Sequence, residues 1–227
     1  MKKPKRSEIA FKNAYIDLLL NEDRDKIFVR TICEKSGYSA MCFYQNYVSK
    51  EKFTQKIIND EIEFYLDNLA EFSDLLYSCN ATEEACVKCK KKFFDHIYEN
   101  KDLYRCIFSN KLAPETDHIY ERKISERLIK SINSNELRIL PIVNTNNGIP
   151  EIKFCENHGP GVCNDKNDYM IWFVVRNRMI TYLLAEIWCK NDFNLSPLEM
   201  SECFYRMMLL LDGGSFIAKY NSLNMRA

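Results

Sequence analysis

The segment Phe28–Phe53, FVRTICEKSGYSAMCFYQNYVSKEKF, decides how the N-terminal part of the chain folds. Apolar side chains recur at the spacing of one helical face on either side of a glycine. They are Val29, Ile32 and Cys33 before it, and Met41 or Cys42 with Phe43 and Tyr47 after it. Gly37 supplies the positive φ that a tight turn between crossing helices needs. Ser39 is an N-cap type of residue at the start of the second apolar run. We therefore predict two short helices, Val29–Ser36 and Ser39–Tyr47, joined as a helix-turn-helix.

The same segment resembles the DNA-binding domain of TetR-type transcriptional regulators. The resemblance covers about the first quarter of the chain and combines Val29, Ile32, Ser36, Gly37, Ser39, Phe43, Tyr44, Tyr47, Ser49, Lys50, Glu51 and Phe53. Two positions depart from the family pattern, because Met41 and Asp23 stand where small residues, commonly glycine, are usual. The resemblance implies an all-α fold of about nine helices. A helix-turn-helix domain would span residues 1–53, and a helical effector-binding and dimerisation domain would span residues 54–227.

DNA recognition requires side chains that read base edges, flanked by groups that hold phosphates. From the resemblance and the helix positions we expect DNA contacts from Arg30, Thr31, Ser39, Ala40, Met41, Cys42, Tyr44, Gln45 and Lys50. Gln45 is the strongest base-reading type on the second helix. Tyr44 and Lys50 match the family's phosphate-holding residues. The alternatives are core packing for Tyr44 and a solvated turn for Lys50.

Charge is distributed unevenly along the 227-residue chain, although its net charge is zero. Through Lys56 there are twelve Lys and Arg against seven Asp and Glu, which gives +5 and leaves −5 for the remainder. A basic head on an acidic body suits a protein of which one end meets phosphates. The N-terminal MKKPKR either follows the DNA or is a solvated tail. No apolar run reaches the roughly 20 residues of a membrane span, and the N-terminus lacks the apolar core of a signal peptide, so we expect a cytoplasmic protein.

Beyond the first quarter, helical patterns alternate with one irregular region. We predict a first helix from Ser7 and later helices over Lys50–Phe72, Thr82–Tyr98, Leu103–Phe108, Pro114–Ile132, Asp168–Lys190 and Ser196–Phe216. Ser73–Asn80 is predicted to be a break. Near residues 138–166 the helical pattern stops, and an Asn-Asn-Gly turn signal allows a small β-hairpin or a long loop.

The resemblance implies an effector pocket in the helical body and a dimer through the last two helices. Candidate ligand-binding residues are Phe94, Tyr98, Tyr104, Phe108, Trp172, Arg176 and Met179. Such aromatic stripes are also typical of a plain core, and Arg176 suits either a ligand anion or an acidic residue across a dimer. The dimer would use Ile180, Leu183, Leu184, Ile187, Trp188, Phe204, Met207, Met208 and Leu211. The alternative is that these residues form only an intramolecular core.

Ten cysteines are many for a cytoplasmic chain, and most stand in helical apolar patterns where Cys behaves as a small hydrophobe. Two loci have metal-ligand types: Cys79 with the pair Cys86 and Cys89, and a loop set of Cys155, His158 and Cys163. Redox sensing by a loop Cys is an alternative. We predict no cofactor and no enzymatic activity, since the sequence has no phosphate-binding Gly loop, nucleophile elbow or H-E-x-x-H.

Together these patterns predict a ligand-responsive DNA-binding transcriptional regulator, most often a repressor in this family, that binds a pseudo-palindromic operator as a dimer. The alternative from another class is a helical small-molecule, metal or redox sensor without specific DNA reading. Double-stranded DNA, a second copy of the chain and an unidentified small-molecule effector are the expected partners.

Overall fold

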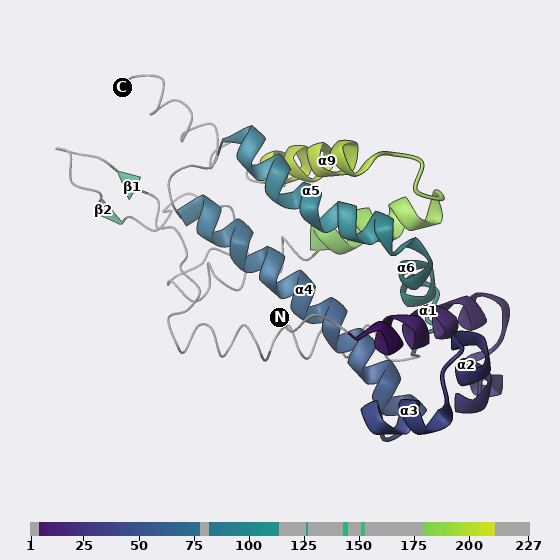
Figure 1. Cartoon of the computed structure of the whole chain (residues 1–227). Helices are drawn as coiled ribbons and strands as arrows, with labels where there is room; N and C mark the ends of the chain where they lie inside the picture. The colour runs from purple at the N-terminus through teal and green to yellow at the C-terminus, as the bar shows by residue number, and fades with distance from the viewer. Residues whose placement is uncertain are drawn as a thin grey trace. The chain divides into compact units, whose positions relative to one another are not determined.

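The described part of the chain is all-α, apart from one short ladder. The computed structural model describes residues 5–77, 82–113, 126, 143–144, 151–152 and 179–211. Its helices are α1 (Arg6–Asn21), the 3-10 turn η1 (Arg24–Lys26), α2 (Val29–Ser36), α3 (Ala40–Asn46), α4 (Lys50–Tyr77), α5 (Glu83–Glu99), α6 (Lys101–Phe108), the helical residues 179–190 and α9 (Pro197–Leu211) (Figure 1). The predicted helix over Pro114–Ile132 lies almost wholly outside the described residues.

The chain packs as two compact units. Unit 1 comprises Met1–Tyr65 and Ile97–Ile124, and unit 2 comprises Leu66–His96 and Ser125–Ala227. Two of the three unit boundaries fall inside α4 and α5, so these two are packing boundaries within helices rather than linkers. The third lies outside the described residues. The predicted division at residues 53 and 54 stays a prediction.

An aromatic cluster forms the core under α1, α2 and α3 in unit 1. Phe43 of α3 is fully buried. Its ring centroid lies 5.2 Å from that of Phe11 and 5.3 Å from that of Phe53, both edge-on. Tyr47 stacks obliquely on Phe53 at 4.6 Å. Edge-to-face rings at these distances contribute beyond their buried area, so α3 is fastened by its inner face.

Local signals set the ends of α2 and α3. Gly37 follows α2 in the left-handed region with φ of 74° and donates its N–H to the Cys33 carbonyl oxygen. Ser39 caps α3, because its Oγ accepts the backbone N–H of Cys42 at 3.2 Å. The predicted glycine turn and serine cap are both confirmed.

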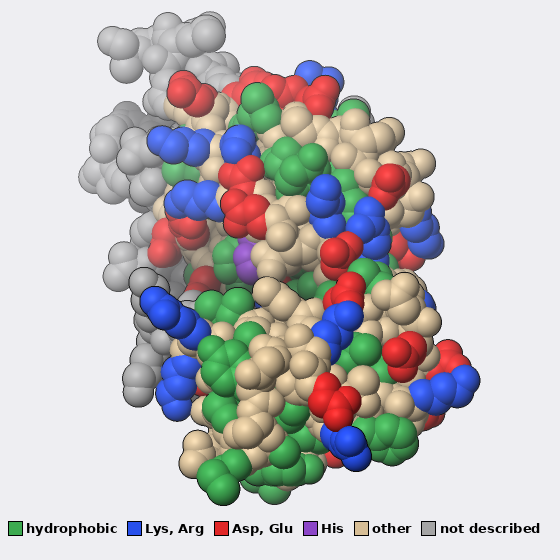
Figure 2. Space-filling view, turned by 45° about the vertical axis from the view of Figure 1, so that its right-hand side comes forward, with side chains coloured by type: hydrophobic (Ala, Val, Ile, Leu, Met, Phe, Trp, Pro, Cys, Tyr) green, Lys and Arg blue, Asp and Glu red, His purple; other side chains and the backbone are tan. Residues whose placement is uncertain are grey.

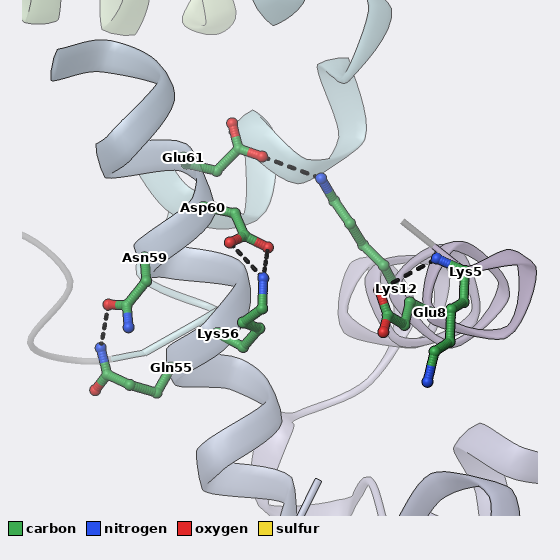
Figure 3. Close-up of polar contacts among 8 residues, drawn as sticks. All are labelled: Lys5, Glu8, Lys12, Gln55, Lys56, Asn59, Asp60 and Glu61. Carbon is green, nitrogen blue, oxygen red and sulfur yellow. Dashed lines mark hydrogen bonds and ion pairs between the residues drawn. The ribbon is translucent and has the colours of Figure 1, made fainter. Parts of the chain in front are cut away.

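A buried ion pair ties α1, α4 and α6 together within unit 1. Glu61 of α4 has a side chain only 3% exposed, and Lys12 of α1 donates to its Oε1 at 3.0 Å (Figure 3). The Tyr104 hydroxyl of α6 donates to Oε2 of the same carboxylate at 3.0 Å. The Lys111 ammonium also donates to the Leu20 carbonyl oxygen at the end of α1, at 2.9 Å. These contacts fix α6 against α1.

In unit 2, aromatic side chains join α5 to the helical residues 179–190. Trp188 is 1% exposed, and its ring lies edge-on to Phe94 at 5.8 Å and to Phe193 at 5.1 Å. Its indole N–H donates to the Leu195 carbonyl oxygen at 3.0 Å, which satisfies the polar atom of an otherwise apolar side chain. A capping box at Ser196 then begins α9, as the sequence predicts.

Two sequence expectations need correction or refinement. The predicted break at Ser73–Asn80 is wrong over its first five residues, because α4 continues to Tyr77. Leu69 and Phe72 stay buried and extend the apolar stripe, while a Ser and an Asp cost only a few tenths of a kcal/mol each in a helix. In the region left open as hairpin or loop, β1 (Val143–Asn144) pairs antiparallel with β2 (Glu151–Ile152).

Among the described helices, none is both long and apolar enough to cross a membrane.

Candidate nucleic-acid interface

Four α3 residues of the predicted DNA-contacting set lie on one exposed face. Ala40, Met41, Tyr44 and Gln45 are exposed, with 73% of Met41 and 56% of Tyr44 accessible. Cys42 is half-buried. Tyr44 touches the buried Phe43 ring edge-on at 5.6 Å, but it lies on the surface and not in the core. Because the buried Phe43 ring anchors the inner face of α3, the side chains on the outer face have fixed positions.

The surface near α2 and α3 includes exposed apolar residues that the sequence did not indicate. Val48, which follows α3, is 84% exposed, and Phe28, which precedes α2, is 66% exposed. Figure 2 shows hydrophobic side chains gathered at the lower end of its view, where Figure 1 places α2 and α3. The sequence did not predict that these two residues are exposed. Both stand at helix boundaries, and a boundary pattern does not indicate whether a side chain is exposed.

Lys50, predicted to hold a phosphate, is bonded inside the molecule. Its ammonium donates to the carbonyl oxygens of Arg24 at 2.9 Å and Ile27 at 2.8 Å, so it closes the end of the 3-10 turn η1. A lysine has three N–H donors, and these bonds occupy two of them. Its phosphate contact stays a prediction, with one donor left to make it. Nothing in the sequence marks the two carbonyls, which come from 23 to 26 residues away.

The predicted contacts on α2 are an exposed ion pair and a half-buried hydroxyl. Arg30 Nε donates to Glu34 Oε1 at 2.7 Å one helical turn away, and both side chains are exposed. Exposed pairs of this kind contribute little free energy, so Arg30 can exchange its carboxylate for a phosphate at small cost. Thr31 is half-buried, and Ser39 is exposed but occupied as the α3 cap.

Lys5, at the end of the basic tail, contacts the far end of α3. Its ammonium donates to Asn46 Oδ1 at 3.2 Å. Its backbone N–H donates to Glu8 Oε2 at 3.3 Å (Figure 3). The first contact joins residues 41 positions apart. Lys5 is therefore held beside α3, whereas the sequence left open whether the basic N-terminus follows the DNA or is a solvated tail.

The predicted effector residues do not gather around one described cavity. Tyr104 and Phe108 of unit 1 lie together, with ring centroids 6.1 Å apart, and Lys101 Nζ lies 4.5 Å from the Tyr98 ring centroid. Phe94 is fully buried in unit 2, and Met179 is 56% exposed there. Trp172 and Arg176 lie outside the described residues.

A pocket of ≈ 240 Å³ with charged residues in its lining lies elsewhere in unit 1. Its lining comprises Tyr15, Arg24, Asp25, Lys50, Glu51, Thr54, Gln55, Ile58 and Ala113. No predicted effector residue lines it. The Ser49 hydroxyl and the backbone N–H of Glu51 lower the pKa of the Glu51 carboxyl, so charges of both signs face this pocket.

Cys86 and Cys89, the C-x-x-C pair, are packed in the core of unit 2. Both are free and buried on α5. Burial raises the pKa of Cys86 to about 12, which keeps it a thiol at neutral pH. Among the residues that the structure describes, no three metal-ligand side chains come together. Cys155, His158 and Cys163, together with Cys79, lie outside those residues.

The predicted dimerisation residues divide into two sets. Ile180, Trp188, Phe204 and Met208 are buried within the chain, at most 3% exposed. Leu183 and Ile187 are 42% and 47% exposed, and with Met179 they form a stripe at four-residue spacing. Leu184 and Met207 are half-buried, and the side chain of Leu211 is outside the described set. The exposed stripe is thus the part free to meet a second chain.

No protein-family model and no curated protein sequence matches this chain. A functional assignment therefore rests on the residues and geometry above.

Proposed function

We propose that the protein is a DNA-binding transcriptional regulator in which α2 and α3 act as a helix-turn-helix. The observation that carries the proposal is the presentation of α3: Ser39 caps it, Phe43 anchors it, and Met41, Tyr44 and Gln45 face solvent together. A recognition helix needs a rigid inner face and an outer face free to enter the major groove. The resemblance to TetR-type regulators agrees with this assignment.

Charge supports a polyanionic partner for this end of the chain. Residues 1–56 carry a net charge of +5. Lys5 is held next to α3, and Arg30 is paired with the exposed Glu34. Basic groups beside an uncharged reading helix match the usual division between phosphate contacts and base contacts.

A dimer would place two such helices on one DNA duplex. The exposed stripe of Met179, Leu183 and Ile187 gives the helical residues 179–190 an apolar face for a second copy. Two recognition helices related by a two-fold axis would read a pseudo-palindrome with half-sites about one helical turn or a little more apart.

Regulation would act through a small-molecule effector bound in the helical body. In this proposal the effector shifts α4 and changes the separation of the two α3 helices. A coupling of about 1–3 kcal/mol gives a 5–150-fold change in DNA affinity. A screen for compounds that release the full-length protein from its selected DNA site would identify the effector.

Selection from random double-stranded DNA by the full-length protein tests the proposal. We expect enrichment of an inverted repeat, and a loss of at least about tenfold in affinity for Gln45→Ala. Ile9→Ala is a matched control, because Ile9 is also exposed (48%) but lies on α1. Thermal melting of each variant excludes unfolding. A selection that enriches no sequence would overturn the proposal and favour the helical sensor without DNA reading.

A further inference from the structure

The exposed face of α3 has an unusual chemistry for a helix that reads bases. Its sequence, AMCFYQN, contains no acidic and no basic residue. Met41 and Gln45, four positions apart, share the exposed face with Tyr44. The face therefore offers a thioether, a phenol and one carboxamide.

Lys5 contacts α3 at its C-terminal end, where its Nζ donates to Asn46 Oδ1. Three other described cations also have protein partners. Lys35 pairs with Asp17, Arg30 pairs with Glu34, and the Lys50 ammonium bonds two carbonyl oxygens. The most common specific contact to guanine is a bidentate Arg or Lys on O6 and N7. Since α3 supplies neither, the outer face is poorly equipped to select G·C pairs.

The groups that α3 does supply suit A·T pairs. A carboxamide forms two hydrogen bonds with adenine, at N6 and N7, and apolar side chains contact the C5-methyl of thymine. Met41 has 73% of its side chain exposed, and its flexible thioether adapts to irregular apolar surfaces.

We propose that α3 reads an A·T-rich half-site, with Met41 against a thymine C5-methyl group and Gln45 on an adenine. This inference rests on the proposed function and adds the class of DNA sequence. An apolar protein partner is the competing occupant of the same surface. The net charge of +5 over residues 1–56 favours a polyanion.

Replacing thymine by uracil tests the methyl contact directly, because uracil lacks only the C5-methyl group. In the duplex obtained by selection, each thymine is replaced singly and binding of the full-length protein is measured at fixed salt. We expect one or two positions in each half-site to lose about fourfold in affinity, equivalent to one methyl group removed from an apolar contact. Replacing the contacted adenine by 7-deazaadenine should cost about tenfold or less.

Variants of the protein test which side chain contacts which base. Met41→Ala should abolish the uracil effect at its position and leave the 7-deazaadenine effect, whereas Gln45→Ala should do the reverse. Ile9→Ala, an equally simple apolar truncation on α1, should keep both effects. This pattern is a double-mutant cycle, so it separates direct contact from general weakening.

The outcomes distinguish the inference from the proposed function. An enriched G·C-rich half-site, or a uracil effect that survives Met41→Ala, overturns the methyl reading and leaves the regulator assignment intact. A selection that enriches no sequence overturns both. In that case, binding of a protein partner that Met41→Ala abolishes would assign the surface to protein docking.

Discussion

The exposed face of α3 and the buried face of α5 both depart from the usual distribution of polarity. The first places apolar side chains in solvent, and the second places a charged side chain in the core. On α3, Met41 lies in solvent, with Val48 just beyond the helix. On α5, the Lys90 ammonium is fully buried. Exposed apolar groups on a rigid support indicate a surface kept for a partner. A buried ammonium requires interaction partners in the core around it.

Lys90 is surrounded by groups suited to a cation. Its Nζ lies 4.7 Å from the Phe72 ring centroid and 4.8 Å from that of Phe204, and it donates to Asn68 Oδ1 at 3.1 Å. The Asn68 side chain in turn donates to the Cys89 carbonyl oxygen at 3.1 Å. Ring faces and an amide oxygen stabilise the ammonium in part. Burial nevertheless lowers the pKa of Lys90 to about 8.

The largest expected effect comes from removing the support beneath the apolar surface. Phe43→Ala should reduce the free energy of unfolding by about 3–5 kcal/mol, because a fully buried aromatic ring leaves a cavity. Urea denaturation measures the change. Val48→Ala, which truncates an 84% exposed side chain, should change it by less than about 0.5 kcal/mol. Similar losses in both variants would contradict the inside–outside assignment of α3.

The buried ammonium should make stability depend on pH. The pKa of Lys90 is lowered from 10.5 to about 8, so between these values the unfolded chain binds more protons than the folded chain. Stability contributed by this group therefore rises as pH increases through that window. Lys90→Met removes the dependence, and its stability relative to wild type should fall by up to about 3 kcal/mol from pH 7.5 to 10.5.

Urea denaturation at several pH values measures this difference for Lys90→Met. The raised pKa of Cys86 acts in the opposite direction at high pH, but it is present in both proteins and largely cancels. Lys88→Met is the matched control, because Lys88 is exposed on the same helix. If the difference in free energy of unfolding between wild type and Lys90→Met stays constant with pH, the Lys90 ammonium is not desolvated as described.

A smaller effect is expected at the start of α3. Ser39→Ala removes the oxygen that accepts the Cys42 N–H and should cost about 1 kcal/mol. Ser39→Asp keeps an acceptor and should restore most of the loss. Thermal unfolding followed by circular dichroism compares the three proteins. Equal melting temperatures for wild type and Ser39→Ala would contradict the capping role.

The smallest expected effect completes the comparison. Met41→Lys places an ammonium on the α3 surface, where water solvates it, so the free energy of unfolding should change by less than about 0.5 kcal/mol. The same urea titration checks this. A loss above 1 kcal/mol would mean that Met41 contributes to the core.

Short-range features of the fold were predictable from the sequence. The positive φ at Gly37, the cap at Ser39 and the capping box from Ser196 to Glu199 each depend on atoms within about four residues. The apolar spacing also marked Phe43 as an inward position, as its burial confirms. The end of α4 was missed because Ser73 and Asp74 read as a break, whereas packing along the helix outweighs their weak propensity.

The sequence predicted which residues of the candidate site lie on the exposed α3 face. It did not predict the hydrogen bonds that the lysines near the site make. The α3 face was anticipated, and its residues Met41, Tyr44 and Gln45 are exposed. The occupation of Lys50 by two backbone carbonyls was not anticipated, since they come from a 3-10 turn distant in sequence. The position of Lys5 beside Asn46 was also missed, because the two residues are far apart in the sequence.

By itself, the sequence determined the all-α class, the turn between α2 and α3 and the uncharged composition of α3. These properties depend on local periodicity, φ preference and side-chain type. Only the tertiary structure decided which lysines are available. Lys88 and Lys90 both belong to the basic run KCKKK, yet Lys88 is exposed and Lys90 is buried against Phe72 and Phe204. The distinction depends on rings that lie far along the chain, because burial is a property of packing and not of the local sequence.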